Sequence, residues 1–274
     1  MTEFRLYDDP GADVAEITTN GDTIKPFLNA ISHVVDEAKI HVDERGLSVC
    51  AVDPANVFMG EVALQADAFE TFDLKEEAAI GVHLDGLQSA VRRARKNSGD
   101  ELTLSIQDRR LTATVSRGYD NHEVVSQSTL DLIDPDSIRQ EPDIPDLNRD
   151  VSLSLDADAF TDALSYAVGG PSEQVWFKVQ AVNQHAKAFY LSGKTDTRSE
   201  SIAIGDVETD GDAEAVYSYD YMKEILGGMA DVEPETVTVV FDDEVNGDEW
   251  NVLYDCLPLG RRDRFLFGRH RQSK

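Results

Sequence analysis

The chain has 274 residues, with 53 acidic and 25 basic side chains and a formal net charge of −28 at pH 7. Hydrophobic residues make up 41 % of it, enough to form a packed core in one large domain or in two smaller ones. The sequence has no run of about 18 apolar residues, which excludes a membrane-spanning helix. Its first residues are polar and acidic, unlike a signal peptide, so we expect a cytoplasmic protein of the prokaryotic cell interior.

The acidic excess is spread along the whole chain instead of being confined to a tail. Such a surface suits molar intracellular salt, where the Debye length is about 3 Å and like charges on the surface repel each other weakly. We therefore expect a halophilic source. The alternative is simply a very soluble acidic protein.

Two helices are predicted in the first half of the chain. Residues 22–38 place Ile24, Phe27 and Ile31 at helical spacing, and residues 84–96 form a second helix with an apolar stripe of its own. Runs of alternating or continuous apolar residues predict strands at 38–42, 46–52, 57–64, 101–107 and 110–116.

The segment 132–147, LIDPDSIRQEPDIPDL, carries three prolines and five acids near the middle of the chain. Each proline fixes φ and removes a backbone donor, so the segment reads as an extended, solvated connector. We call residues 132–147 the strap. It divides the chain into predicted domains at 1–131 and 148–274.

The second half repeats the pattern of the first. A helix is predicted at 156–168, with Asp156 as its N-cap, and another at 219–229. Strands are predicted at 175–182, 187–192, 201–204, 236–241 and 250–254. The helices of the two halves match at offsets of about 132 and 134 residues, which favours an internal duplication over two unrelated α+β domains.

The segment Leu47–Val57, LSVCAVDPANV, followed at a distance by the strap, resembles the DNA sliding clamps of the proliferating cell nuclear antigen (PCNA) family, most closely the haloarchaeal ones. The source would be a halophilic archaeon or a virus that infects one. The resemblance implies an α+β chain with two topologically similar clamp domains and helices on one face of antiparallel sheets. Three such chains form a pseudo-six-fold ring around duplex DNA, bound without sequence specificity.

A clamp of this kind has no cofactor and acts as a polymerase processivity factor. Its implied partners are a DNA polymerase, a clamp loader, a ligase and nucleases, which bind through PCNA-interacting-peptide motifs and act in replication and repair. The resemblance implies a peptide pocket formed by the strap, the 47–57 region and the C-terminal residues. The expected pocket residues are Val52, Val57, Met59, Ile144, Pro145, Leu266 and Phe267.

The densest internal basic cluster lies at the end of the helix predicted over 84–96, a helix that would line the ring's hole. We expect the following residues to contact DNA phosphates: Arg92, Arg93, Arg95 and Lys96, with Lys25 and Lys223 as weaker candidates. The alternative is a basic helix end that complements its own dipole. The resemblance also places the subunit interface on two strands, at His122, Val124, Ser126 and Ser128 of one subunit and Phe189, Leu191 and Gly193 of the next.

No enzyme signature is found. Gly193-Lys194-Thr195 lacks the first glycine of a phosphate-binding loop, and the histidines form no metal-ligand spacing. We therefore predict a protein that is not an enzyme and holds no metal. Two alternatives stay open: a monomeric DNA-binding processivity factor, and an enzyme of unrecognised type on an α+β fold.

Overall fold

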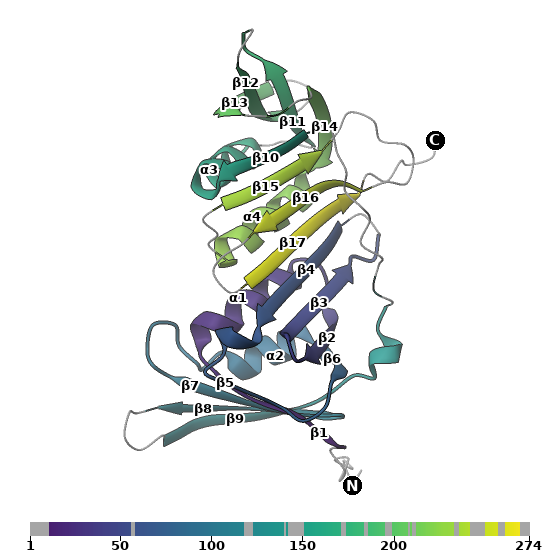
Figure 1. Cartoon of the computed structure of the whole chain (residues 1–274), viewed down its shortest axis with the longest axis vertical. Coiled ribbons are helices and arrows are strands. Elements are labelled where there is room, and N and C mark those ends of the chain that lie inside the picture. The colour runs from purple at the N-terminus through teal and green to yellow at the C-terminus, as the bar shows by residue number, and fades with distance from the viewer. Residues whose placement is uncertain are drawn as a thin grey trace. The chain divides into compact units, whose positions relative to one another are not determined.

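The computed structural model (Figure 1) describes residues 11–55, 58–117, 123–139, 141, 151–170, 174–183, 186–194, 199–207, 209, 212–232, 236–241, 250–256 and 261–268. The chain divides into two compact units. Unit 1 comprises residues 1–50 and 63–141, and unit 2 comprises residues 51–62 and 142–274. The chain therefore passes from unit 1 to unit 2 within the strap, and the short segment 51–62 belongs to unit 2.

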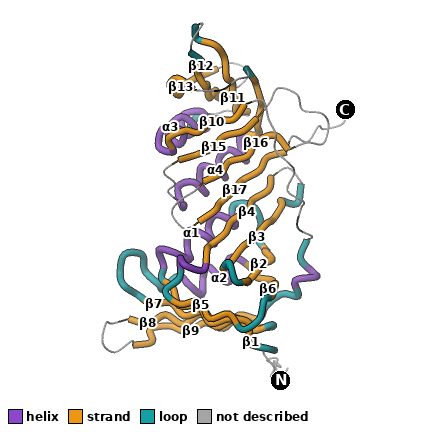
Figure 2. Tube along the Cα trace, in the orientation of Figure 1, coloured by secondary structure: helices purple, strands orange, loops and turns teal. Residues whose placement is uncertain are grey.

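Unit 1 contains a five-stranded antiparallel sheet in the order β5-β1-β7-β8-β9 and a group in which β2 pairs with β3 and β6. Figure 2 shows the helices α1 and α2 beside these strands. The elements are β1 (Asp13–Thr19), α1 (Gly21–Ser32), β2 (Glu37–Asp43), β3 (Gly46–Val52), β5 (Thr71–Leu74), β6 (Ala78–His83), α2 (Leu84–Val91), β7 (Glu101–Gln107), β8 (Arg110–Arg117) and β9 (Glu123–Asp131), with short 3₁₀ turns at Ala66–Ala68 and Pro135–Ser137.

Unit 2 contains the sheet order β13-β12-β11-β14 and the antiparallel run β10-β15-β16-β17. The strand β4 (Phe58–Gln65) contributes residues to both units. The other elements are β10 (Val151–Asp156), α3 (Ala157–Val168), β11 (Gln174–Ala181), β12 (Lys187–Lys194), β13 (Ser199–Val207), β14 (Ala213–Ser218), α4 (Tyr219–Val232), β15 (Thr236–Phe241), β16 (Trp250–Cys256) and β17 (Arg261–Gly268).

The two units share one topology, which confirms the predicted duplication. In unit 1, β1 pairs with β7, β7 with β8, and β2 with both β3 and β6. In unit 2 the corresponding strands make the same antiparallel pairs: β10 with β15, β15 with β16, and β11 with both β12 and β14. A helix follows the first strand of each unit, and a second helix precedes its last three strands.

Each unit buries the apolar face of its strands against its helices. Along β7, buried and half-buried residues alternate without interruption, as expected for a strand with one face in the core. Unit 2 centres on an aromatic cluster in which the rings of Phe177 and Tyr217 lie 4.8 Å apart at their centroids. Phe160, Phe189 and Phe241 complete this cluster, and each is at most 2 % exposed.

Helix α3 matches its prediction closely, and the Asp156 carboxylate caps it by accepting a hydrogen bond from the backbone N of Ala159 over 2.9 Å. Two other predicted helices are shorter in the structure. α1 ends at Ser32 instead of residue 38, because β2 begins at Glu37. α2 ends at Val91 instead of residue 96, so the basic residues follow the helix instead of belonging to it.

Candidate nucleic-acid interface

The basic residues predicted to contact DNA lie in a tight turn between α2 and β7. We call residues 92–100 the basic turn. Helix α2 cannot continue through it, because Asp100 accepts a hydrogen bond from the backbone N of Arg95 over 3.1 Å. Asn97 then adopts the left-handed conformation (φ 54°), which asparagine tolerates better than most residues. The chain is thereby turned away from the helix axis.

Asp100 is the central residue of this turn. Its side chain is only 2 % exposed, and its carboxylate accepts hydrogen bonds from the guanidinium groups of Arg95 (3.1 and 3.2 Å) and Arg117 (3.0 and 3.1 Å). Hydrogen bonds from Arg95 and, to a smaller extent, Arg117 hold the pKa of the Asp100 carboxyl well below its usual range, although burial acts in the opposite direction. The carboxylate therefore stays charged at any pH at which the protein would work.

The turn is also fastened to neighbouring elements. Arg117, from β8, donates a hydrogen bond to the carbonyl of Arg93 over 3.2 Å. From α1, the Nζ of Lys25 donates to the carbonyl of Arg92 over 3.1 Å, and the Asp22 carboxylate accepts from the backbone N of Asn97 over 3.0 Å. Carbonyl groups at the end of α2 thus receive positively charged donors, which suits the negative end of a helix.

Three cations of the turn remain available to a ligand. The side chains of Arg92, Arg93 and Lys96 are exposed, and within the described part of the chain they have no ion-pair partner. Arg95 is 59 % exposed as well, but part of its guanidinium is held by Asp100. In a chain with a net charge of −28, an exposed cluster of three unpaired cations is an attractive site for an anion.

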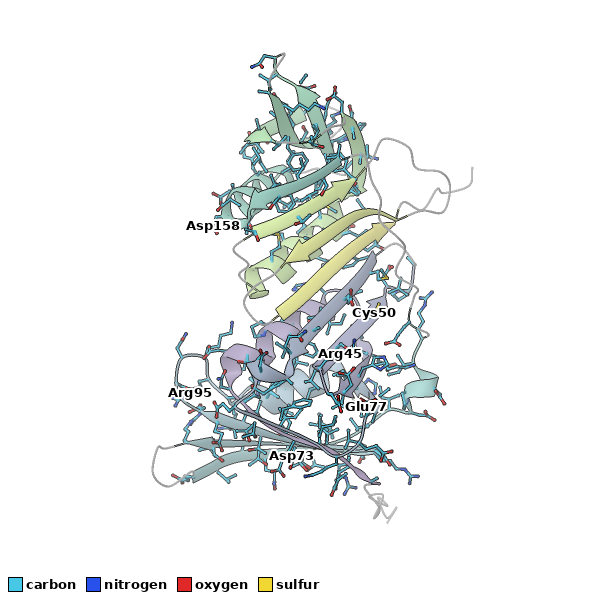
Figure 3. All side chains as sticks on the ribbon, in the orientation of Figure 1. Arg45, Cys50, Asp73, Glu77, Arg95 and Asp158 are labelled. Carbon is cyan, nitrogen blue, oxygen red and sulfur yellow. The ribbon has the colours of Figure 1, made fainter. Side chains whose placement is uncertain are left out.

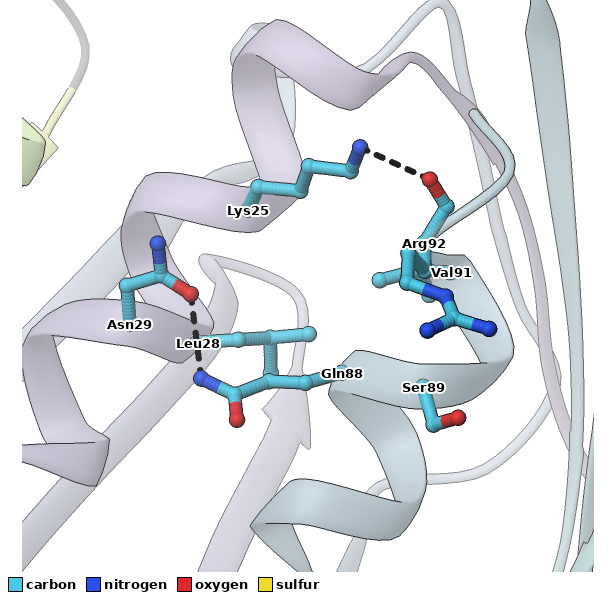
Figure 4. A pocket seen from close by; sticks show the side chains of 7 residues that line it. All are labelled: Lys25, Leu28, Asn29, Gln88, Ser89, Val91 and Arg92. Carbon is cyan, nitrogen blue, oxygen red and sulfur yellow. Dashed lines mark hydrogen bonds between the residues drawn. The ribbon is translucent and has the colours of Figure 1, made fainter. Parts of the chain in front are cut away.

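A pocket of about 380 Å³ adjoins the turn, between α1 and α2 (Figure 4). The Nε2 of Gln88 donates a hydrogen bond to the Oδ1 of Asn29 over 3.0 Å and joins the two helices. Lys25 also lines the pocket, and burial lowers its pKa, which the nearby charge of Lys96 lowers further. The pocket lining is Lys25, Leu28, Asn29, Gln88, Ser89, Val91 and Arg92, so two of the predicted DNA contacts share one surface.

The last predicted DNA contact, Lys223, belongs to unit 2, whereas the basic turn belongs to unit 1. It is exposed on α4 in unit 2, where its Nζ stands 5.3 Å from the centroid of the Tyr219 ring. Sequence reasoning missed the residues that fasten the turn. Asp100 is one acid among 53 and Arg117 lies in a strand, so neither gave a local signal.

The predicted peptide pocket falls mostly outside the described residues or side chains, which do not include Val57, Ile144, Pro145, Leu266 and Phe267. Of the other two, Val52 is 6 % exposed and Met59 is fully buried. Between these two residues, the Asp53 carboxylate accepts a hydrogen bond from the backbone N of Phe58 over 2.8 Å.

The first half of the strap is described, and it belongs to unit 1. Ile133 forms a bridge with Gly81 of β6, in which its backbone N donates to the Gly81 carbonyl over 2.8 Å. At residue 141, Glu141 Oε1 and His41 Nε2 of β2 are 2.6 Å apart. The strap therefore contacts the sheet of unit 1 at Ile133 and again at Glu141.

The predicted subunit interface needs a correction. Val124, Ser126 and Ser128 lie on β9, which ends the five-stranded sheet, and Val124 is 58 % exposed; His122 lies outside the described residues. Phe189, Leu191 and Gly193 lie on β12, which is already paired on both sides, with β11 and β13. A strand paired on both sides cannot accept another one, so the prediction for these three residues is wrong, and the open edge beside them is β13.

Among the described residues, no group of three or more His, Cys, Asp or Glu side chains is arranged to hold a metal ion. None of the helices in the described part is long and apolar enough to cross a bilayer. The chemistry that this surface offers is attraction of phosphate groups by point charges and guanidinium forks.

A duplicated α+β unit with antiparallel sheets, an open sheet edge in each unit and a basic turn defines the class of protein as a DNA sliding clamp. Residues 15–140 match the family described as "Proliferating cell nuclear antigen, N-terminal domain". The DNA polymerase sliding clamp of Natronomonas pharaonis is 35 % identical over 210 residues, which cover 75 % of this chain and 80 % of that protein. The chain belongs to the proliferating cell nuclear antigen family of DNA polymerase sliding clamps.

Other relatives agree with this assignment. The DNA polymerase sliding clamp of Haloarcula marismortui is 34 % identical over 223 residues, which cover 79 % of this chain and 85 % of that protein. Among solved structures, PCNA of A. fulgidus, bound to the C-terminal region of FEN-1, is similar with a TM-score of 0.75 and 26 % identity, covering 95 % of this chain and 100 % of that one. The PCNA of Entamoeba histolytica has a TM-score of 0.78 at 14 % identity, covering 93 % and 98 %, and supports the fold alone.

Proposed function

We propose that this chain is the subunit of a closed homotrimeric clamp that encircles duplex DNA in the cell interior and tethers replication and repair proteins to it. The observation that carries the DNA contact is the basic turn, in which Arg92, Arg93 and Lys96 are exposed and unpaired among the described residues. Such cations attract phosphates of any sequence, and phosphate contacts position a protein on DNA without reading bases.

A ring suits this arrangement in high salt. Phosphate contacts weaken steeply as the salt concentration rises, because counterion release then contributes less. A few exposed cations cannot by themselves hold a protein on DNA in molar KCl. A closed ring stays on DNA by topology, so three weakly attracting cations per subunit are sufficient to centre it.

The double variant Arg92→Glu with Arg93→Glu tests the DNA contact. It should lower the affinity for a short labelled duplex and lower processive synthesis, while the mass in high salt stays that of the wild type. The control reverses two other exposed cations of unit 1, Arg45 and Lys75, each paired with a nearby aspartate. Arg45→Glu with Lys75→Glu makes the same charge change. Equal DNA affinity in the two double variants would refute the basic turn as the contact site.

For assembly, we propose that β9 of one subunit joins β13 of the next. Each strand ends its described sheet and has one open edge, and an open edge is a template for adding a strand. Light scattering in about 2–3 M KCl, a range that screens the acidic surfaces, should report a mass three times 30.3 kDa. A monomer at micromolar concentration in that buffer would rule out the ring.

For partner binding, we propose that the strap and the neighbouring pocket receive a PCNA-interacting peptide from a polymerase, clamp loader, ligase or nuclease. The A. fulgidus relative bound to the C-terminal region of FEN-1 supports a peptide site of this kind. Replacing Ile144 by Asp would place a charge in an apolar pocket, which is costly. Calorimetry in molar salt should show loss of peptide binding at unchanged trimer mass, and unaltered affinity would remove Ile144 from the site.

A further inference from the structure

We propose that Asp100 is a positioning residue for DNA binding: it does not touch DNA, but its buried carboxylate holds the basic turn in the shape that presents Arg92, Arg93 and Lys96. This inference rests on the proposed function of the basic turn. It divides the cations of the region into two groups. Arg95 and Arg117 bind Asp100 and maintain the shape, whereas the other three are available for phosphates.

The hydrogen bonds show how one carboxylate can fix the whole turn. Asp100 accepts from both the backbone N and the guanidinium of Arg95, so it sets the path of the chain and the direction of that side chain. Arg117 binds the same carboxylate and also donates to the carbonyl of Arg93. Asp100 therefore anchors Arg95 directly and Arg93 through Arg117, on either side of the buried Ala94.

Ser98 adds a short-range link to this arrangement. Its Oγ donates to the carbonyl of Arg95 over 2.8 Å and accepts from the backbone N of Asp100 over 3.3 Å. The turn between these residues is thereby closed on itself. The side chains of Arg92, Arg93 and Lys96 are exposed, whereas the Asp100 carboxylate at the hydrogen-bonded centre of the turn is buried.

Because the Asp100 carboxylate is buried, its ion pairs with Arg95 and Arg117 are suited to high salt. An ion pair on the surface is screened when the Debye length falls to about 3 Å, whereas a buried pair is screened much less. The Asp100 side chain is 2 % exposed, while the carboxylate of Asp73, in an ion pair with Lys75, is 62 % exposed. The Asp100 pairs should therefore keep the turn in shape under the conditions that weaken surface pairs.

Charge and positioning predict opposite effects for the variant Asp100→Asn. The substitution removes a negative charge next to the basic turn, so simple electrostatics predicts tighter binding of DNA. Positioning predicts weaker binding, because asparagine cannot hold two guanidinium groups and the turn loses its shape. The sign of the change therefore separates the two explanations.

The experiment measures the affinity of the full chain for a labelled duplex over a KCl series that starts at the lowest concentration at which the wild type keeps its mass, because phosphate attraction is strongest there. The matched control is Asp73→Asn, which makes the same charge change at an exposed ion pair of unit 1; Figure 3 shows Asp73 away from Arg95. For Asp100→Asn we expect binding weaker by on the order of tenfold. The slope of log K against log salt should become shallower by about 0.9 for each phosphate that the turn no longer neutralises, while Asp73→Asn stays close to wild type.

A lower melting temperature with unchanged affinity and slope would show that Asp100 serves stability alone, and would overturn the inference. Binding tighter than that of Asp73→Asn would overturn it as well. If Asp100→Asn fails to fold, the variant Arg117→Lys provides the test instead. This variant keeps the positive charge but loses the planar guanidinium group that donates to both Asp100 and the carbonyl of Arg93. Weaker binding with a shallower slope supports positioning, and unchanged binding refutes it.

The double variant Arg92→Glu with Arg93→Glu is measured beside these. If it binds DNA like its own control, the proposed contact site fails, whatever the Asp100 variants do. If it binds more weakly while Asp100→Asn and Arg117→Lys bind normally, the contact site stands and only the positioning role of Asp100 fails.

Discussion

The hydroxyl of Tyr221 donates a hydrogen bond to the carboxylate of Asp53 over 2.9 Å, although 168 residues separate the two in the sequence. Asp53 also accepts from the backbone N of Ala55 and of Phe58, over 3.1 and 2.8 Å. The ring of Phe58 lies 5.6 Å from that of Tyr221 at its centroid. Asp53, in the segment that resembles the clamp family, and Phe58 are thus both in contact with Tyr221 of α4 within unit 2.

Replacing Tyr221 by Phe should destabilise the protein by about 1–2 kcal/mol, because Asp53 loses a donor to its buried charge. Burial, together with the charge and hydrogen bond of Asp53, raises the pKa of Tyr221 to about 12. Since this pKa lies above the ordinary value of about 10, the contribution of Tyr221 is complete below pH 10 and is lost as the pH rises toward 12. Urea unfolding of both proteins from pH 8 upward measures the difference, which should shrink over that interval. The control Tyr219→Phe should be nearly neutral.

Replacing Gly81 by Ala should detach the start of the strap from β6. A Cβ at this position would lie 2.5 Å from the carbonyl oxygen of Ile133 and 2.7 Å from the Cδ1 of Ile138. The first of these is a backbone atom and can yield only if the strap moves, so we expect a loss of about 1–3 kcal/mol. Hydrogen exchange at the amide of Ile133, which bonds to the Gly81 carbonyl, should become faster.

The control for this change is Gly86→Ala. A Cβ there would meet its nearest neighbours at 3.8 and 3.9 Å, an ordinary contact, and alanine in a helix is favoured over glycine by about 0.5–1 kcal/mol. This variant should be neutral or slightly more stable, with unchanged exchange at Ile133. Unchanged exchange in Gly81→Ala as well would mean that the strap is not seated on β6 in solution.

Replacing Val124 by Glu should weaken the trimer. Val124 is an apolar side chain, 58 % exposed, on the open edge of β9, and a carboxylate there would have to be desolvated in the proposed joint with β13. The control is Val182→Glu, a valine that is 56 % exposed but follows β11, a strand that is already paired on both sides. Light scattering on dilution in molar KCl should show dissociation of the first variant alone. Equal stability of the two trimers would place the joint elsewhere.

The contribution of Asp100 to folding stability should depend on pH in the acidic range. Its pKa is held below the ordinary aspartate value of about 3.9. A lowered pKa means that this contribution is complete above the unfolded value and is lost as the pH falls below it. The difference in unfolding free energy between wild type and Asp100→Asn should therefore be constant from pH 7 to about pH 5 and shrink at lower pH. A difference that stays constant down to pH 3 would contradict this.

Much of the architecture could be predicted from the sequence, because apolar periodicity is a local property. The apolar stripe of α3 and its N-cap at Asp156 predicted both ends of that helix to within one residue. The end of α2 could not be predicted in this way. Arg92 and Arg93 are good helix formers, and the buried Ala94 continues the apolar stripe, but the hydrogen bond that the backbone N of Arg95 donates to the Asp100 carboxylate ends the helix.

Local patterns in the sequence could likewise not predict the order of strands in a sheet. β12 and β13 are both alternating segments, and their sequences do not say which of them has a neighbour on each side. The prediction of Phe189 at a subunit edge therefore failed, while that of Val124 fell on a strand that does end its sheet. The candidate DNA contacts could be recognised from composition, because a cluster of bases stands out in an acidic chain. The carboxylate of Asp100, which holds the basic turn, does not stand out among so many acids.

The shared topology of the two units has a consequence for the electric potential that DNA would meet inside the ring. α2 is followed by Arg92-Arg93-Ala94-Arg95-Lys96, whereas its counterpart α4 ends at Val232 and is followed by Glu233-Pro234-Glu235. In the proposed trimer, the basic sequence that follows α2 would occur three times around the hole and not six, so the electric potential of the hole would repeat every 120° instead of every 60°. A duplex that rotates as it slides would meet an electric potential that rises and falls three times per turn. Added salt would screen the charges and reduce this variation.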